Sequence, residues 1–227
     1  MTTACIVVAA GRGERLGPGA PKALRRLAGQ PLIVHAARAA LGSGVLDLLV
    51  VAAPGNLVND VEAAVRPLGA RLTIVAGGAT RRESVAAALA TLPKDVDVVL
   101  VHDAARCLAP AGLFGTVAAA VAAGADAVVP VLAIADTVKQ VDGSAVVATV
   151  DRAALRAAQT PQGFRRDVLV RAHASVAAEA TDDAGLVERL GRAVQVVPGH
   201  EEAFKVTRPV DLVLAECVLA RRSGGVP

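Results

Sequence analysis

Short apolar runs alternate with longer Ala-rich segments along this chain. The runs are rich in Val, Leu and Ile, and in the longer segments apolar residues return every three or four positions. The first pattern is typical of buried strands and the second of helices, so their alternation predicts βαβ units and a mainly parallel sheet of the α/β class. We expect strands at residues 5–9, 48–52, 72–75, 96–101, 127–131 and 193–197. We expect helices at residues 31–41, 57–68, 81–92, 111–123, 166–178, 182–190 and 208–219.

One segment, residues 136–151, departs from this alternation. Its sequence DTVKQVDGSAVVATVD places two β-rich runs around Asp142-Gly143, a strong hairpin signal. We therefore expect a two-stranded arm that leaves the sheet. Because an isolated hairpin is only marginally stable in water, this arm needs a surface to lie on, and a second subunit would provide one. Residues 1–227 are expected to form a single domain that carries this dimerisation arm.

Composition narrows the class of protein. With 227 residues, 54% of them hydrophobic, the chain suits one α/β domain. The net charge is only +3, and three phenylalanines are its whole aromatic content, so we expect no nucleic-acid binding, which relies on stacking platforms and basic surfaces. The three cysteines stand far apart, with no C-x-x-C pair, which indicates a reducing cytoplasm without disulfides or structural zinc.

Neither the first residues nor the most apolar stretch predicts a targeting or membrane segment. The start lacks a basic region and its apolar run ends by Gly11, so we expect a strand rather than a signal peptide, and a cytoplasmic location. Residues 113–135 are long enough to span a bilayer, but Asp126 near the middle would cost about 2.5–3.5 kcal/mol there, and Gly124 interrupts the stretch. A helix followed by a buried strand is the prediction, with no membrane partner.

The junction after the first strand has the composition of a phosphate-binding loop. In AGRGERLGPGAPK, glycines allow close approach of the backbone to a ligand, and three cations share the loop. The glycines are at 11, 13, 17 and 19, and the cations are Arg12, Arg15 and Lys22. The alternative is a Gly-rich turn with solvated charges.

Two known phosphate loops do not match this junction. A Walker A loop needs Ser or Thr after its lysine, whereas Ala23 follows Lys22. The dinucleotide fingerprint fails because its third glycine comes one residue late, at Gly17, and because the strand LLVVAAPGN ends without the acid that would bind a ribose. The late third glycine and the missing acid both count against a nicotinamide-dependent oxidoreductase.

Five further motifs follow along the chain. VHDAAR comes at the end of a buried strand, where open α/β sheets bind ligands; there Asp103 is a candidate for a metal or hydroxyl and Arg106 for a phosphate. The alternative is that Asp103 caps a helix and His102 packs as a neutral side chain. In GGATRRESV, Ser84 is a candidate for contact with a base or ribose, whereas solvated first-turn charges are the alternative for its two arginines. The remaining motifs are VDRAALRAAQTPQGF, TDDA and FKVTRPVDL.

In this order and spacing, the motifs together resemble the 2-C-methyl-D-erythritol 4-phosphate cytidylyltransferase family over nearly the whole chain. The resemblance implies a doubly wound, nucleotidyltransferase-type Rossmann-like fold with a protruding β-hairpin arm. It also implies a homodimer with exchanged arms and a divalent metal, usually Mg²⁺. The implied reaction converts CTP and methylerythritol 4-phosphate into 4-diphosphocytidyl-2-C-methyl-D-erythritol and pyrophosphate, in the non-mevalonate isoprenoid pathway.

The resemblance also implies residue roles. Arg15 and Lys22 correspond to cations on the α-phosphate in the transition state, and Arg152 and Lys205 to the pair that positions the attacking phosphate. Asp103 is a candidate metal ligand; otherwise the CTP phosphates carry the metal. The implied nucleotide-binding residues are Ala9, Ala10, Gly11, Gly13, Lys22, Gly78 and Ser84. The implied residues for the methylerythritol phosphate are Asp103, Arg106, Thr137, Arg152, Thr160, Thr181 and Thr207.

Four positions depart from the pattern of the family, and three other functions remain open at this point. The departures are Val8 for Pro, Ala79 for an acid, Cys107 for Pro and Gly185 for Ser. None removes a charged catalytic position, although Ala79 leaves open how tightly cytosine or its ribose is held. The alternatives are a ribitol 5-phosphate cytidylyltransferase, a nicotinamide-dependent oxidoreductase and a nucleotide-binding regulator without enzyme activity. TDDA and the VDR to QTPQ segment favour methylerythritol phosphate over ribitol phosphate.

Overall fold

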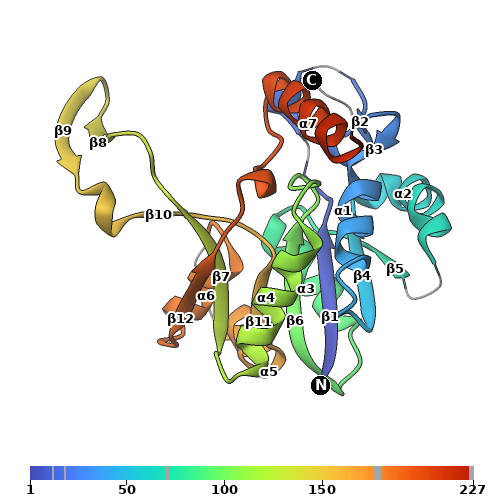
Figure 1. Ribbon diagram of the computed structural model, residues 1–227. Helices are drawn as coiled ribbons and strands as arrows, with labels where there is room; N and C mark the ends of the chain where they lie inside the picture. Colours follow the sequence, from blue (N-terminus) through green and yellow to red (C-terminus); the bar gives the residue numbers. More distant parts are fainter. Residues whose placement is uncertain (12, 18, 70–71, 176–179, 225–227) are drawn as a thin grey trace.

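A computed structural model describes residues 1–11, 13–17, 19–69, 72–175 and 180–224. Its centre is a mixed sheet in the order β10-β7-β11-β6-β1-β4-β5, with β12 also paired to β7 (Figure 1). The parallel part comprises β1 (Thr2–Val8), β4 (Leu48–Ala53), β5 (Leu72–Ala76) and β6 (Val96–Asp103). The remaining strands are β7 (Ala127–Ala133), β10 (Arg156–Ala158), β11 (Gln162–Arg165) and β12 (Val194–Pro198).

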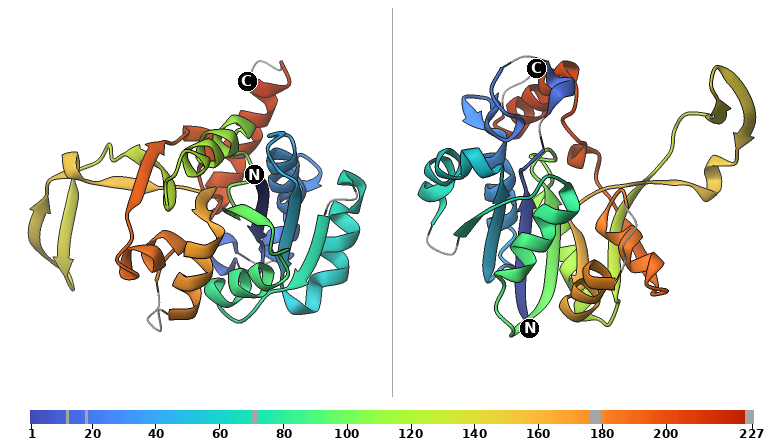
Figure 2. Two further views of the ribbon diagram at one scale, coloured as in Figure 1. Left: turned by 90° about the horizontal axis from the view of Figure 1, so that it is seen from below. Right: turned by 180° about the vertical axis from the view of Figure 1, so that it is seen from behind.

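Helices cover both faces of this sheet, because alternate strand residues are apolar on both sides (Figure 2). In β1, Cys5 and Val7 belong to one buried cluster and Ala4 and Ile6 to the other. The first cluster is completed by α1 (Leu32–Leu41), α2 (Val58–Val65) and α4 (Ala111–Ala122), with a contact from α7 (Pro209–Arg222). The second is completed by α3 (Arg81–Ala90), α5 (Arg166–Ser175) and α6 (Asp183–Arg189).

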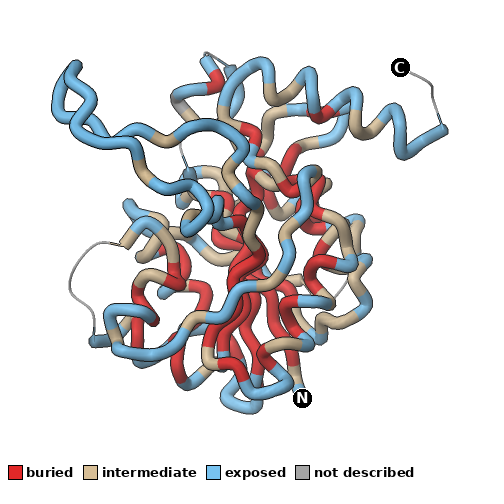
Figure 3. The backbone as a smooth tube through the Cα atoms, turned by 60° about the vertical axis from the view of Figure 1, so that its left-hand side comes forward, coloured by how far each residue is buried: buried red, intermediate tan, exposed pale blue. Residues whose placement is uncertain are grey.

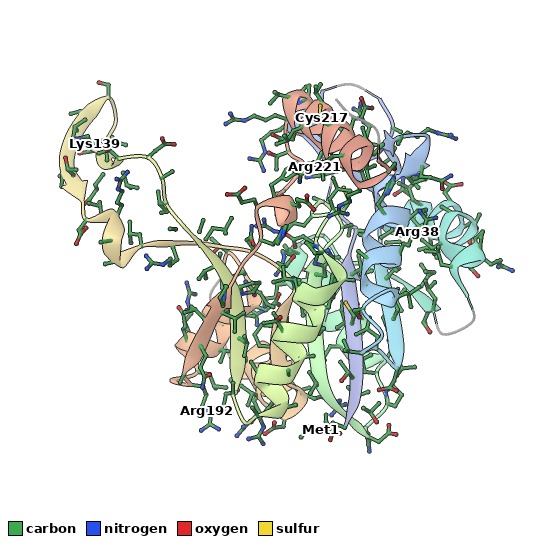
Figure 4. All side chains as sticks on the ribbon, viewed as in Figure 1. Met1, Arg38, Lys139, Arg192, Cys217 and Arg221 are labelled. Carbon is green, nitrogen blue, oxygen red and sulfur yellow. The ribbon has the colours of Figure 1, made fainter. Side chains whose placement is uncertain are left out.

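The other elements of the described residues are short. A small hairpin pairs β2 (Arg26–Leu27) with β3 (Gln30–Pro31). Single 3₁₀ turns are η1 (Glu14–Leu16), η2 (Lys22–Leu24), η3 (Gly55–Leu57), η4 (Arg66–Leu68), η5 (Arg152–Ala154) and η6 (Glu201–Ala203). Met1 lies at one end of the sheet, and Cys217 and Arg221 on α7 lie at the other (Figure 4). The carboxyl ends of the parallel strands therefore point toward α7.

The structure confirms the predicted α/β alternation, with local differences. All six predicted strands and seven predicted helices are present, but the helix expected over 57–68 is α-helical only at 58–65, between two 3₁₀ turns. The helix expected over 166–178 is described through Ser175, and residues 176–178 lie outside the described residues. Strands β10 and β11 were not predicted, since they are short and polar or Ala-rich. Strand β11 runs antiparallel between β6 and β7, where Gly163 leaves room for Val117 of α4.

The predicted arm is present and lies away from the body of the protein. It consists of β8 (Val138–Asp142) and β9 (Ala145–Val150), which pair only with each other among the described strands. Its turn falls on Gly143 and Ser144, one residue later than predicted, because Asp142 pairs with Ala145. Figure 3 shows the arm mostly exposed and the centre of the sheet buried, and Lys139 on the arm stands far from the core (Figure 4). The arm valines at 141, 146 and 147 are each about 60% exposed.

The apolar stretch at 113–135 folds as predicted. It forms most of α4 and then β7, and both elements contribute buried residues to the core. Among the described residues, no helix combines the length and the apolarity that crossing a membrane requires.

Candidate active site

A cavity opens where β1 and β6 end side by side. Val8 pairs with Asp103 across the two strands, and the amide of Ala104 continues the contact by donating to the carbonyl of Val8. The cavity is lined by Val8, Ala9, Gly11, Lys22, Ala23, Leu32, Asp103, Ala104, Ala105 and Lys205. Three of the predicted motifs, far apart in the sequence, therefore meet at one place.

The Gly-rich loop brings Lys22 against the end of β1. Gly13 has φ +71°, and a Cβ there would lie 2.4 Å from the Cβ of Lys22, so this close approach requires glycine. Arg25 stabilises the loop, because its guanidinium donates to the carbonyls of Gly17 and Ala20. The exposed Arg15 lies on the short turn η1. Arg12, the third cation of the predicted cradle, is outside the described residues.

Positive charge is concentrated in this cavity. Burial lowers the pKa of Lys22 to about 8, and repulsion by Lys205 and Arg15 contributes to the decrease, while Asp103 opposes it. Several cations close together at one cavity attract a polyanion. This electrostatic pattern favours the phosphate-binding interpretation of the loop over a turn with solvated charges.

Asp103 is the anionic counterpart of these cations. Its Oδ2 lies 2.7 Å from the Lys205 Nζ and its Oδ1 lies 3.2 Å from the Arg81 Nε. Burial by itself would raise the pKa of Asp103, but Arg81, Lys205 and Arg106 together hold it well below its usual range. Asp103 is therefore an ionised carboxylate on the cavity wall.

His102 is a buried structural residue. Thr160 Oγ1 accepts a hydrogen bond from the Asp103 amide at 3.0 Å and shares a second one with His102 Nδ1 at 3.1 Å. The imidazole packs against Phe114, with ring centroids 4.9 Å apart. Burial lowers the pKa of His102 to about 4, so the ring is neutral at physiological pH. Thr160 thus fixes the backbone of the residue that carries the site carboxylate.

Two residues expected to bind the acceptor contact the protein itself. Arg106 donates to the carbonyl of Ala203 at 2.8 Å and to that of Ala158 at 3.1 Å, so it ties the segment before Lys205 to β10. The Thr207 hydroxyl donates to Asp211 at 2.9 Å, near the start of α7.

The other acceptor-binding candidates lie at two separate places. Thr181 is exposed just before Asp182, which caps α6 through the amide of Gly185. Thr137 and Arg152 are exposed at the base of the arm, where Arg152 donates to the carbonyl of Ala135.

The Gly77–Gly78 turn lies against the loop after β1. A Cβ on Gly77 would come within 2.8 Å of the Cβ of Ala10, so the two backbones are in close contact. Ser84 is fully buried, and its Oγ accepts from the Gly78 amide at 3.1 Å and donates to the Thr80 carbonyl at 2.8 Å. This hydroxyl therefore shapes the turn, and its predicted contact with a base or ribose stays a prediction.

Sequence analysis missed Arg81 as a site residue. Its Nη1 lies 2.6 Å from Asp183 Oδ2, besides the contact with Asp103, and its side chain is only 27% exposed. A first-turn arginine on a helix is ordinarily solvated, and the acids that recruit it are 22 and 102 residues away. No local pattern in the sequence points to such partners.

Cationic side chains converging on a Gly-rich loop at the carboxyl edge of an open α/β sheet define a nucleotidyltransferase, the class that the family comparison also indicates. The family model for IspD, 2-C-methyl-D-erythritol 4-phosphate cytidylyltransferase, matches residues 3–221. The chain belongs to this family.

Individual relatives agree with this assignment. The 2-C-methyl-D-erythritol 4-phosphate cytidylyltransferase of Streptomyces avermitilis is 56% identical, with 97% of this chain and 92% of that protein covered. The crystal structure of the Thermus thermophilus enzyme of the same name has a TM-score of 0.77 at 39% identity, covering 95% of this chain and 98% of that one. A 4-diphosphocytidyl-2C-methyl-D-erythritol synthase structure from Anaerococcus prevotii has a TM-score of 0.85 over 97% and 99% of the two chains; at 24% identity it supports the fold alone.

These findings confirm the predicted family, fold class and enzyme class. The protein is a CTP-dependent cytidylyltransferase of non-mevalonate isoprenoid biosynthesis that makes 4-diphosphocytidyl-2-C-methyl-D-erythritol. The assignment decides against the ribitol 5-phosphate cytidylyltransferase, the oxidoreductase and the regulator without enzyme activity.

Proposed function

We propose that the cavity performs in-line transfer of CMP, with the phosphate of the acceptor attacking the α-phosphorus of CTP. A phosphate dianion needs no general base, so catalysis consists of alignment and neutralisation of charge. The observation that carries the proposal is geometric: Lys22 and Lys205 line one cavity together with Gly11 of the Gly-rich loop. Burial, with repulsion by Lys205 and Arg15, lowers the pKa of Lys22 in this cavity. Arg15 and Lys22 stabilise the α-phosphate in the transition state, and Lys205 with Arg152 orients the attacking phosphate.

The nucleotide side consists mainly of backbone. Ala9, Ala10, Gly11 and Gly13 form one edge, and Gly78 forms the other, across the close contact between Gly77 and Ala10. Fixed amide and carbonyl groups recognise the amino donor and ring acceptor of cytosine without aromatic stacking. Ser84 acts indirectly, by fixing the Gly78 amide.

The remaining predicted site residues belong to the proposed binding site for methylerythritol phosphate. Asp103 and Thr181 hold hydroxyl groups of methylerythritol, while Arg106, Thr160 and Thr207 shape the surrounding backbone and hydroxyl surface. Of these residues, Asp103 lies on the wall of the cavity and Thr181 is exposed to solvent. The structure thus leaves both side chains accessible to the acceptor.

Mg²⁺ is the proposed cofactor. Asp103 is an ionised carboxylate on the cavity wall, and Mg²⁺ is usually bound by one or two carboxylates together with substrate phosphates. Within the described ranges, no group of three His, Cys, Asp or Glu side chains could hold a metal ion. The donor set therefore fits an ion carried by the CTP phosphates and contacted by Asp103. When bound, such an ion neutralises charge on the phosphates.

The proposed assembly is a homodimer of the single domain, residues 1–227, through exchanged arms at 136–151. Each arm presents Thr137 and Arg152 at its base and about 60%-exposed valines further out, an apolar surface that a partner would cover. Arg152 then completes the active site of the partner. We also propose a cytoplasmic location, since Cys5, Cys107 and Cys217 are free thiols and the first two are buried.

The test is pyrophosphate release from CTP and Mg²⁺ with methylerythritol 4-phosphate or ribitol 5-phosphate as acceptor. We expect turnover with methylerythritol phosphate, little with ribitol phosphate, and loss of activity in EDTA that added Mg²⁺ restores. Normal turnover of Arg152→Ala and Lys205→Ala would overturn the assigned roles, and activity unaffected by EDTA would overturn the metal.

A further inference from the structure

Arg81 connects three segments of the site. It is the first residue of α3, three residues after Gly78 and three before Ser84. From there its guanidinium contacts Asp103 Oδ1 at 3.2 Å and Asp183 Oδ2 at 2.6 Å. The Asp103 and Asp183 side chains are 11% and 1% exposed. In such buried surroundings, the interaction energy of an ion pair depends strongly on the distance and orientation of the two charged groups.

Each carboxylate has a second fixed partner. Asp103 Oδ2 contacts the Lys205 Nζ at 2.7 Å, and Asp183 Oδ1 accepts from His173 Nε2 at 3.0 Å. Arg81 is the cation shared between the two carboxylates. One guanidinium therefore links the orientations of the two carboxylates, because its planar fork can contact two acids at once.

The contact with Asp183 is one of several that hold the start of α6, beside those of Gln162 and His173. Asp183 is the first residue of α6 and follows Thr181 by two positions, and the capping residue Asp182 also accepts from Gln162 at 2.7 Å. A shift of Asp183 would therefore move Thr181. Arg81 thus controls two acceptor contacts, Asp103 and Thr181, from a helix whose first turn belongs to the nucleotide side.

We infer that Arg81 is a positioning residue that holds the acceptor-binding half of the site, Asp103 and the start of α6, in register with the nucleotide-binding turn. The inference rests on the proposed function for the roles of Asp103, Lys205 and Thr181. The nucleotide-binding turn itself has independent support from Ser84 and from the capping box of Thr80 and Glu83. Loss of Arg81 therefore disturbs acceptor binding and alignment, while CTP binding is preserved.

Arg81→Lys is the decisive variant, because it keeps the charge and loses the fork. We expect kcat/KM for methylerythritol phosphate to fall on the order of 10²-fold, as for a misplacement of about 1 Å. The Kd for CTP, measured by calorimetry without acceptor and without Mg²⁺, should stay close to that of the wild type. Arg82→Lys is the matched control, since it removes a fork at the next position, where the guanidinium donates to the His173 carbonyl. Arg82→Lys should retain the wild-type kcat/KM for methylerythritol phosphate and the wild-type Kd for CTP.

Asp183→Asn provides a second test, at the other end of the same ion pair. If Arg81 acts through Asp183, the losses of Arg81→Lys and Asp183→Asn should not add in the double variant. The number of CTP sites per chain, from the same calorimetry, corrects for unfolded protein. Two results for Arg81→Lys would refute the inference. One is an acceptor KM and kcat that stay unchanged after this correction, and the other is a rise in the CTP Kd by the same factor as the fall in kcat/KM for the acceptor.

Lys205→Met separates failure of this inference from failure of the proposed function. If Lys205→Met weakens acceptor binding and Arg81→Lys does not, only the role of Arg81 is wrong. If Lys205→Met leaves the acceptor KM and kcat unchanged, the proposed acceptor site is itself wrong, and the inference fails with it.

Discussion

The ammonium of Lys205 lies 2.7 Å from the Asp103 carboxylate, although 102 residues separate them in the chain. Asp103 is nearly buried, whereas the Lys205 side chain is 40% exposed. The buried acid therefore holds a partly exposed cation at the cavity, beside Lys22. The ion pair therefore has a buried acid on the protein side and a cation that solvent can reach.

Arg15→Ala and Lys22→Ala should each lower kcat by about 10²–10³-fold and raise the KM for CTP far less. In the proposed mechanism both cations stabilise negative charge that grows in the transition state, and the loss of one such contact typically has this effect. Steady-state pyrophosphate release over a range of CTP concentrations measures the two parameters. Near-normal kcat with a weakened KM would show that these cations only bind ground-state phosphates.

The pH dependence of kcat/KM for CTP should have a descending limb near pH 8. Lys22 attracts phosphate only when protonated, and its pKa of about 8 in the free protein means that its charge is lost as the pH rises through this value. Lys22→Arg should lack this limb, because arginine stays charged, but should turn over slowly, because a planar fork does not replace an ammonium. A wild-type profile that stays level up to pH 10 would contradict the assignment.

Thr160→Val should destabilise the protein by about 1–3 kcal/mol, since it leaves the Asp103 amide and His102 Nδ1 without a partner in a buried place. Activity should fall as well, because the backbone of Asp103 loses its anchor. Urea unfolding and pyrophosphate release measure the two effects. Thr160→Ser keeps the hydroxyl and is the control; equal losses in both variants would point to packing instead of the hydrogen bonds.

The enzyme should prefer CTP strongly over UTP, and Ser84→Ala should weaken both CTP binding and this preference. The Ser84 hydroxyl fixes the Gly78 amide, and a backbone group recognises a base only when its position is fixed. The kcat/KM values for the two nucleotides provide the measurement. Comparable wild-type values for CTP and UTP would disprove the assigned nucleotide surface.

Mixed dimers of Arg15→Ala and Arg152→Ala chains should recover activity. If Arg152 serves the active site of the partner, one site of each mixed dimer carries both defects and the other carries none. Random pairing of equal amounts makes about half of the dimers mixed, so roughly a quarter of all sites should be intact. The two inactive variants are refolded together and assayed for pyrophosphate release. Absence of recovery, with mixed dimers demonstrated, would rule out the exchanged arms.

Much of the fold could be predicted because local periodicity and burial agree in this chain. Cys5 and Val7 face one layer of helices and Ala4 and Ile6 face the other, so the first strand is apolar throughout and is recognisable as a central strand. Strand β11 was missed because QGFR has neither length nor a regular pattern. It is a strand because β6 and β7 leave room for one between them, which is a property of the whole sheet.

The sequence by itself determined the chemistry of the site. The Gly-rich loop with Arg15 and Lys22 indicated phosphate binding, because glycines allow close approach of the backbone and the cations attract phosphate. The order of all the motifs together gave the resemblance to the cytidylyltransferase family. The tertiary structure decided which of these side chains contact one another. Ser84 and Thr160 bond inward to the protein, and Arg81 proved to be shared by Asp103 and Asp183. Such long-range pairs depend on how the strands and helices are packed in three dimensions, and distance along the chain does not encode that arrangement.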